Sequence, residues 1–257
     1  MLLAIPARLG ATLISIAEQG GGIAIMAGQI LRRLVPPDID RLEFFRNMYE
    51  MGVKAVHIVA ATGMFTGAIM VIQAVPLVEQ FGAKQILGWS ATFTTFREIG
   101  PLLIGLMFNG RVGANNTAEL GTMVVTEQID ALRALAIDPI TYLVVPRALS
   151  MIIMMTTLVI FGDVLALLGA MVTAYVLVDL HPLAFINSAL PMLEFWDFEV
   201  GVIKASLFGV MIALTSCYFG LATTGGAPGV GRAVSKSVVA SASGIYIADY
   251  LSTFILG

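Results

Sequence analysis

The stretch TTFREIGPLLIGLMFNGRVGANNTAELGT, residues 94–122, decides how this chain folds. Its first half is as apolar as a membrane span, yet Arg97 and Glu98 stand side by side within it. A charged side chain inside a bilayer costs on the order of 3–10 kcal/mol or more. Such residues face other helices or a wet cavity, so we expect the helix that carries them to border one.

The composition indicates a membrane protein. Of the 257 residues, 58% are hydrophobic and only 12% are charged, and the mean hydropathy is +0.92. Soluble domains are about 45–50% apolar and about 25% charged. The net charge of -3 gives no support to a nucleic-acid partner. Cys217 has no second cysteine to pair with, so we expect it to be a small buried side chain.

Five segments are predicted to span the membrane, because a span needs about 20 apolar residues. They are residues 55–78, 86–110, 148–178, 200–222 and 237–256. Residues 7–35 are interrupted by charges and by the glycines at 20–22, so we expect an interfacial helix there, with a sixth span as the alternative. The predicted fold is an all-α integral membrane protein forming a single domain, residues 1–257.

The positions of lysine and arginine predict the orientation, since short cytoplasmic loops are enriched in both. With the N-terminus in the cytoplasm and the C-terminus outside, only Lys84 falls in an outer loop. The outer loops instead hold the acids Glu79, Asp179, Glu194, Asp197 and Glu199. The cations then expected on the cytoplasmic side are Arg8, Arg32, Arg33, Arg41, Arg46, Lys54, Arg111, Arg133, Arg147, Arg232 and Lys236.

A cytoplasmic helix is predicted over residues 117–137, between the second and third spans. Thr117 suits its N-cap, and Pro139 disfavours helix at the preceding residue. An apolar stripe recurs at three- and four-residue intervals: Leu120, Val124, Ala131 and Leu135. The helix is predicted either to dock a partner, with Glu119, Glu127 and Asp130 for ionic contacts, or to lie on its own spans.

The charges inside the spans also allow two interpretations. Arg97 and Glu98 either anchor the headgroup of an amphipathic substrate or form ion pairs between helices, with Lys204 or Asp249 as partners. Lys204 either snorkels to the outer surface or contacts a headgroup. Asp249 is expected to be a hydrogen-bonded acid at a helix contact, and Pro101 loosens the helix that follows Arg97.

No catalytic or metal-binding set is recognisable. GGAPGVGRAVSKS, residues 225–237, has the glycine spacing of a phosphate loop, but Arg232 and Ala233 occupy its Lys and Ser/Thr places. We expect a flexible loop there. His57 and His181 fall on opposite sides of the predicted membrane, so we predict that the chain is not an enzyme and binds no cofactor or metal.

The ordered motifs between residues 96 and 147 resemble the MlaE/YrbE permease family of ABC transporters. They are REIGP at 97–101, GRVG at 110–113, AELG at 118–121, EQIDA at 127–131 and Asp138 followed by Pro139. The resemblance covers essentially the whole chain, including Lys204 and Asp249.

The resemblance implies a homodimer of permeases held by two cytoplasmic ATPase subunits in a bacterial inner membrane. It also implies a periplasmic ring of MCE-domain protein, often a STAS-domain subunit, and phospholipid as the cargo moved between inner and outer membranes. Residues 117–137 then become the coupling helix, with the ATPase-coupling residues Glu119, Glu127, Gln128, Ala131, Leu135 and Asp138. A lipid pocket at the dimer interface is implied, with Arg97, Glu98 and Lys204 as its lipid-binding residues.

Two rival functions stay open at this point. One is an ion-driven secondary transporter with Asp163 and Asp249 as proton sites, although paired broken helices in internal repeats are missing from the sequence. The other is a passive membrane anchor for the MCE ring.

Overall fold

The computed structural model describes residues 4–33, 40–82 and 86–256, and these residues form helices with no strand among them. The all-α prediction is confirmed for this part of the chain, whereas Lys84 and residues 34–35 lie outside it. The α-helices are α1 Ala4–Arg33, α2 Arg41–Met51, α3 Val56–Gln80, α4 Leu87–Thr94, α5 Gly100–Phe108, α6 Ala114–Val125, α7 Gln128–Ala134, α8 Val145–Val178, α9 Pro182–Ala189, α10 Phe195–Leu221 and α11 Gly226–Leu256. Short 3-10 helices cover Val53–Ala55 and Leu190–Met192, and π-helical turns cover Thr95–Ile99, Asn109–Gly113 and Ile140–Val144.

Four helical stretches in the described residues are long and apolar enough to cross a membrane. They are Arg41–Gln80, Ile140–Val178, Phe195–Leu221 and Gly226–Leu256. Each covers one of the predicted spans, except that the predicted span 200–222 runs one residue past Leu221. The remaining predicted span, 86–110, is a chain of α4, a π turn and α5 that packs against α3 and α10. It is not among the four stretches, so its crossing stays a prediction.

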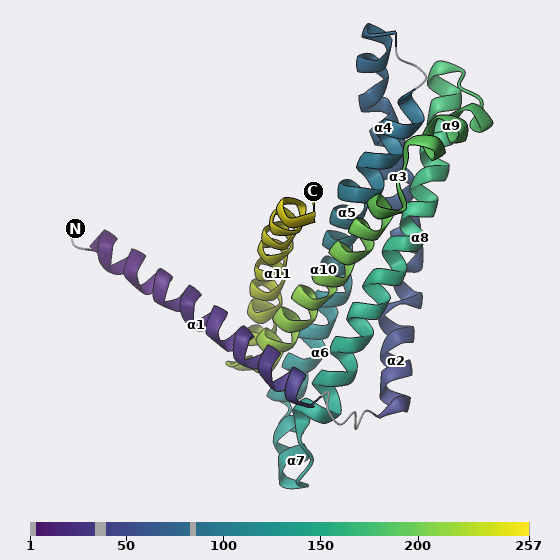
Figure 1. Cartoon of the computed structure of the whole chain (residues 1–257). Coiled ribbons are helices and arrows are strands. Elements are labelled where there is room, and N and C mark those ends of the chain that lie inside the picture. Colours follow the sequence, from purple (N-terminus) through teal and green to yellow (C-terminus); the bar gives the residue numbers. More distant parts are fainter. Residues whose placement is uncertain (1–3, 34–39, 83–85, 257) are drawn as a thin grey trace.

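The bundle has two distinct ends (Figure 1). One end carries α7, α2, the beginning of α8 and the beginning of α11. The opposite end carries α4 and α9. We refer to these as the α7 end and the α9 end.

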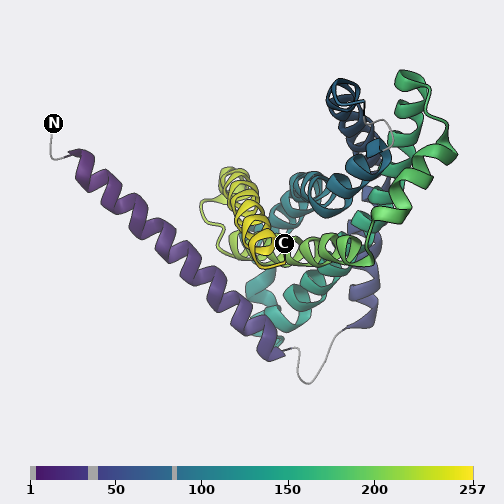
Figure 2. The same cartoon turned by 45° about the horizontal axis from the view of Figure 1, so that its top comes forward.

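Helix α1 runs without interruption through the glycines at 20–22 and projects from the bundle (Figures 1 and 2). Only its C-terminal part packs on α10, where Gly22 lies so close to the Tyr218 ring that a Cβ there would overlap it. Met26 and Ile30 of α1 are also buried, as members of the main hydrophobic core cluster. Whether α1 lies in the membrane interface stays a prediction.

The contact between α3 and α8 relies on small residues. A Cβ on Gly63 would overlap the Gly162 carbonyl oxygen, and one on Gly67 would overlap that of Ala166. Small residues four apart let two membrane helices approach closely, where dispersion replaces the missing hydrophobic drive. The spacing of Gly63 and Gly67 is visible in the sequence, and sequence analysis missed it.

Two local predictions are wrong. Residues 226–237 form the first turns of α11 rather than a flexible loop, because Ala233 and Ser237 are buried against the bundle and tertiary packing overrides the glycines. Residues 117–137 are not one helix, since the chain breaks at Thr126 and Glu127. Thr117 is no N-cap: it is buried inside α6, and its hydroxyl donates to the Gly113 carbonyl at 2.9 Å.

Candidate functional site

A cluster of ionisable side chains lies between α5, α10 and α11. The π turn Thr95–Ile99 supplies Arg97 and Glu98, α10 supplies Asp197 and Lys204, and α11 supplies Asp249. We call these five residues the buried charge cluster. The structure therefore brings together all three predicted lipid-binding residues, from helices far apart in the sequence.

The π turn explains how two adjacent charges find different partners. Gly100 N–H donates to the Thr95 carbonyl, five residues back, and Pro101 has no N–H to continue the α-helical ladder. A π turn inserts one extra residue into a helix, and such insertions are frequent at functional sites. Here it directs Glu98 towards Lys204 and Arg97 towards Asp197.

Lys204 is completely buried and surrounded by acceptors. Its Nζ lies 2.5 Å from Glu98 Oε2 and 3.1 Å from Asp249 Oδ1, and it donates to Thr253 Oγ1 at 2.8 Å. The Thr253 hydroxyl lies 3.1 Å from Glu98 Oε1. Of the two alternatives for Lys204, snorkelling is wrong, because three oxygen partners hold the ammonium inside the bundle.

Arg97 is held by a different set of groups. Its Nη1 donates to Asp197 Oδ1 at 2.9 Å, and its Nη2 donates to the Leu256 carbonyl at 3.2 Å. Its Cζ lies 5.5 Å from the centroid of the Phe93 ring. Asp197 also accepts from the Glu194 backbone N–H as part of a capping box that starts α10. Asp197 was expected in an outer loop, and its role as the Arg97 partner was missed because the capping box moves it into the helix.

The predicted ion pairing between helices is present, with Glu98 and Asp249 on Lys204. Two cations and three carboxylates make up the buried charge cluster, so no cation is left without an acid of the same chain. The side chain of Lys204 is 0% exposed and that of Arg97 16%, against 30% for Glu98. Glu98 is thus the most accessible of the three predicted lipid-binding residues.

Asp163, the other candidate acid, lies apart from the cluster on α8. Its side chain is buried against the backbone of Gly100, and its Oδ1 has no hydrogen-bond partner among the described residues. The glycine is required there, since a Cβ at Gly100 would overlap this oxygen.

The predicted coupling residues divide between two places. Helix α7 protrudes from the bundle, and Ile129 is its only buried residue (Figure 1). Gln128 and Ala131 are exposed on it, and so is Leu135, which directly follows the helix. Glu127 precedes the helix with φ 59°, a left-handed conformation that costs roughly 1–2 kcal/mol for a residue with a Cβ. That backbone conformation turns the chain sharply between α6 and α7.

Glu119 and Asp138 are not part of α7. Glu119 accepts from Arg147 Nη1 at 2.8 Å and from Asn115 Nδ2 at 2.7 Å. Asp138 Oδ2 lies 2.5 Å from Arg33 Nε and thereby ties the end of α1 to the chain after α7. Burial raises the pKa of Asp138, but hydrogen bonds from Thr141, from the Ile140 N–H and from Arg33 outweigh it, so the pKa lies below its ordinary value.

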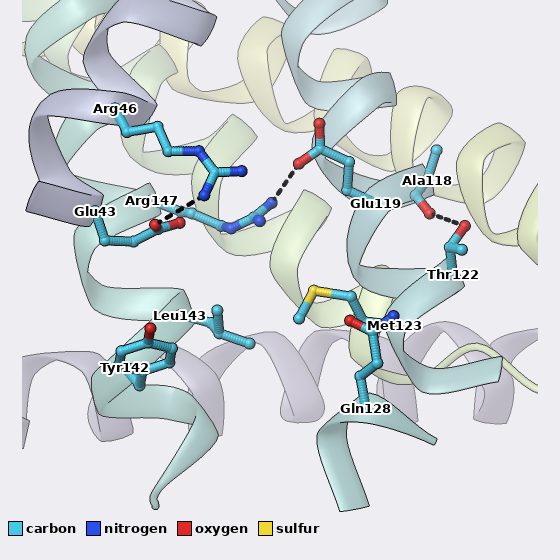
Figure 3. A pocket seen from close by; sticks show the side chains of 10 residues that line it. All are labelled: Glu43, Arg46, Ala118, Glu119, Thr122, Met123, Gln128, Tyr142, Leu143 and Arg147. Carbon is cyan, nitrogen blue, oxygen red and sulfur yellow. Dashed lines mark hydrogen bonds and ion pairs between the residues drawn. The ribbon is translucent and has the colours of Figure 1, made fainter. Parts of the chain in front are cut away.

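A pocket of about 580 Å³ opens beside α7 (Figure 3). Arg147 crosses it to reach Glu119, Arg46 reaches Glu43 at 3.5 Å, and Gln128 at the start of α7 forms part of its wall. Residues at the start of the protruding helix, on α2 and on α8 therefore line one pocket. Sequence analysis missed Arg147, although a charged residue directly after Pro146 in an apolar run was a visible signal.

Comparison with known proteins identifies the family of this chain. The family described as Permease MlaE matches residues 44–255. A protein of Rickettsia felis named "Probable ABC transporter permease protein" is 36% identical over 253 residues, covering 98% of each chain.

More distant relatives also align over most of the chain. A protein of Synechocystis named as a probable ABC transporter permease is 34% identical over 231 residues, covering 90% of this chain and 88% of its own. The chloroplastic protein TRIGALACTOSYLDIACYLGLYCEROL 1 of Arabidopsis thaliana is 32% identical over 237 residues, covering 92% of this chain and 68% of its own. The chain is thus a multi-pass membrane protein of the ABC transporter permeases, and it belongs to the MlaE permease family.

Proposed function

We propose that the chain is the permease subunit of an ATP-driven transporter that moves phospholipid between the inner and outer membranes of a bacterium. The main observation in favour of a lipid cargo is that the buried charge cluster lies beside an exposed apolar surface. Asp249 and Thr253 of α11 contact Lys204, whereas Tyr250, Phe254 and Ile255 of the same helix are exposed. An amphipathic ligand needs both kinds of surface, one for its headgroup and one for its chains.

The name of one relative supports a lipid cargo. The Arabidopsis protein is named for trigalactosyldiacylglycerol, which is a glycerolipid. We infer that this chain also handles a glycerolipid, with Arg97, Glu98 and Lys204 nearest the headgroup. Because Lys204 is fully buried and paired, a direct contact between its ammonium and a lipid phosphate requires a second conformation of the permease.

The proposed assembly assigns the partners that the family resemblance implies to exposed surfaces of the chain. A second permease copy covers the apolar face of α11, which includes Tyr246 and Ile247, and the lipid pocket lies between the two copies. Two ATPase subunits dock on α7 through Glu127, Gln128, Ala131 and Leu135. Glu119 and Asp138 act more indirectly, by holding Arg147 and Arg33. An MCE-domain ring contacts the α9 end, and a STAS-domain subunit is expected on the ATPase.

The proposed orientation places the α7 end in the cytoplasm and the C-terminus outside. Arg46, Lys54, Arg111 and Arg147 belong to elements that meet at the α7 end. Positively charged residues accumulate on the cytoplasmic side of inner-membrane proteins. In this orientation α1 lies in the inner interface, and residues 86–110 cross as the second of five spans.

An ion-driven transporter is not favoured. Asp249 is engaged with Lys204 rather than lining an open path, and Asp163 is buried against backbone. The relatives are named as ABC transporter permeases, which use a separate ATPase.

The test is transport in liposomes by the purified complex of this chain with its ATPase. A fluorescent phospholipid should move only when ATP is present, and Arg97→Ala should reduce that movement at least about tenfold, since it removes a charged contact. Lys236→Ala, which removes an exposed cation of α11, is the matched control and should transport normally. ATP-independent movement would refute the ABC mechanism, and normal transport by Arg97→Ala would refute the headgroup role.

A further inference from the structure

A second cavity at the α7 end shares no residue with the buried charge cluster. It has a volume of about 430 Å³ and adjoins the pocket of Figure 3, with which it shares Arg46, Glu119 and Arg147. Ligand pockets commonly measure about 300–1,000 Å³. We call this cavity the Arg111 pocket. Its charged lining consists of Arg46, Lys54, Arg111, Arg147, Glu50 and Glu119.

Positive charge is in excess in this lining. Lys54 pairs with Glu50, and Arg147 pairs with Glu119. Arg111 forms no ion pair with a carboxylate among the described residues. Its Nη1 lies 3.1 Å from His57 Nε2. Because a guanidinium only donates, the imidazole accepts this hydrogen bond and adds no negative charge. The remaining donors of Arg111 are therefore open to an anion.

The inner wall of the pocket is buried and rich in donors. Arg147 is 6% exposed, Asn47 5% and Asn116 1%. Arg147 Nη1 donates to Asn116 Oδ1 at 3.0 Å, but its Nε is buried and has no hydrogen-bond partner within residues 40–82 and 86–256. A buried donor left unpaired costs roughly 1–3 kcal/mol, and more when it is charged. Arg147 thus keeps a hydrogen-bonding capacity that the residues around this pocket do not use.

We propose that the Arg111 pocket binds the phosphate of an anionic phospholipid from the membrane leaflet at the α7 end. Phosphate oxygens suit arginine because the planar guanidinium donates to two of them at once. Basic pockets between membrane helices on this type of surface hold anionic headgroups. The site is distinct from the proposed cargo pocket and does not depend on which lipid is transported.

The helix beside the pocket favours a lipid over free phosphate. Helix α2 contributes Asn47 to the pocket, and it also exposes Leu42, Phe45 and Tyr49 at 81%, 65% and 57%. These three residues are spaced at i, i+3 and i+7, so they share one apolar face. This exposed apolar face would contact the acyl chains of a lipid whose phosphate the pocket holds.

The test is native mass spectrometry of the purified full-length chain, titrated with phosphatidylglycerol and, separately, with zwitterionic phosphatidylcholine. We expect phosphatidylglycerol to be retained preferentially, and Arg111→Gln to weaken that retention at least about tenfold. Arg111→Lys keeps the charge and should retain most of the binding. Arg133→Gln removes an exposed arginine of α7 and should bind as the wild type does. Arg97→Gln should leave this binding intact, which separates it from the cargo pocket.

Other results would overturn the proposal. Equal retention by Arg111→Gln and the wild type would show that Arg111 holds no lipid. If Arg133→Gln lost as much phosphatidylglycerol binding as Arg111→Gln, the binding would depend on the total charge of the protein rather than on Arg111. Competition by millimolar inorganic phosphate would identify free phosphate, rather than a lipid, as the ligand.

Discussion

The two polar regions of this permease contain the same kinds of side chain but differ in how their cations are paired. In the buried charge cluster, Arg97 and Lys204 each meet a carboxylate of the chain itself. In the Arg111 pocket, Arg111 meets only an imidazole and Arg147 keeps a buried unpaired nitrogen. In the first region each cation has a carboxylate partner, and these pairs help to fix the arrangement of α5, α10 and α11. The second is left unsatisfied and is open to an anion.

Burial decides what each charge contributes. Removing one partner of a buried ion pair strands the other charge and costs about 3–5 kcal/mol, whereas an exposed pair contributes about 0–1 kcal/mol. Lys204 is 0% exposed, whereas Lys54 at the α7 end is 50% exposed. The same substitution at both lysines therefore tests the comparison directly.

The largest effect is expected for Lys204→Met. Glu98 and Asp249 lose the ammonium between them, so we expect the free energy of unfolding to fall by about 3–5 kcal/mol. Lys54→Met, which leaves only the exposed Glu50, should cost less than about 1 kcal/mol. Chemical denaturation of the purified chain in detergent measures both. If the two variants lost equal stability, the buried charge cluster would not differ energetically from a surface pair.

A second test concerns charge without a partner. Glu127 is exposed and forms no ion pair within the described part of the chain. We expect Glu127→Lys to change the free energy of unfolding by less than about 1 kcal/mol, the scale of a charge near a helix N-terminus. It should nevertheless abolish the transport-coupled ATPase activity, because the reversed charge meets the partner at α7.

Glu79→Lys makes the same reversal at the C-terminal end of α3, near the α9 end of the bundle. It should leave ATP hydrolysis and transport coupled. Retained pull-down of the ATPase together with normal coupling in Glu127→Lys would remove Glu127 from the docking surface.

Sequence patterns predicted most of the helices because apolar length and periodicity are local properties. They did not predict how the helices end or bend. The left-handed position after α6 is occupied by Glu127 rather than by a glycine, so no sequence signal marks the break. The helical start of α11 depends on the burial of Ala233, which is a tertiary contact. The continuous helix predicted over 117–137 breaks at Glu127 and has ended by Ala136, and both residues have a left-handed backbone conformation.

The candidate site was predictable in part for a similar reason. A charge in an apolar run is conspicuous, so Arg97, Glu98, Lys204 and Asp249 were found from the sequence. Lys204 was named as an ion-pair partner, but Asp197 as the partner of Arg97 was not, because that contact depends on the capping box of α10 and on the π turn that separates Arg97 from Glu98. Arg111 sits at the end of its span, where an arginine is ordinary, and only the fold shows that it faces a pocket.

The smallest effect is expected at the ion pair between Arg33 and Asp138, whose side chains are 33% and 41% exposed. The pKa of Asp138 is below its ordinary value in the folded chain, so the folded state favours the ionised carboxylate. Its contribution is therefore complete at pH values above the ordinary carboxyl pKa and is lost as the pH falls through the lower folded value. At neutral pH, Asp138→Asn should cost less than about 1 kcal/mol.

The pH dependence separates this pair from a packing effect. In acid, wild type and Asp138→Asn should become equally stable, because both then carry a neutral group at this position. Arg33→Gln should show the same loss at neutral pH, and the double variant should lose little more than either single one. A loss that persisted unchanged in acid would mean that Asp138 stabilises the chain through its hydrogen bonds to Thr141 and the Ile140 N–H alone. The connection between α1 and the region after α7 would then not be electrostatic, and pairing across elements would be confined to buried sites such as Lys204.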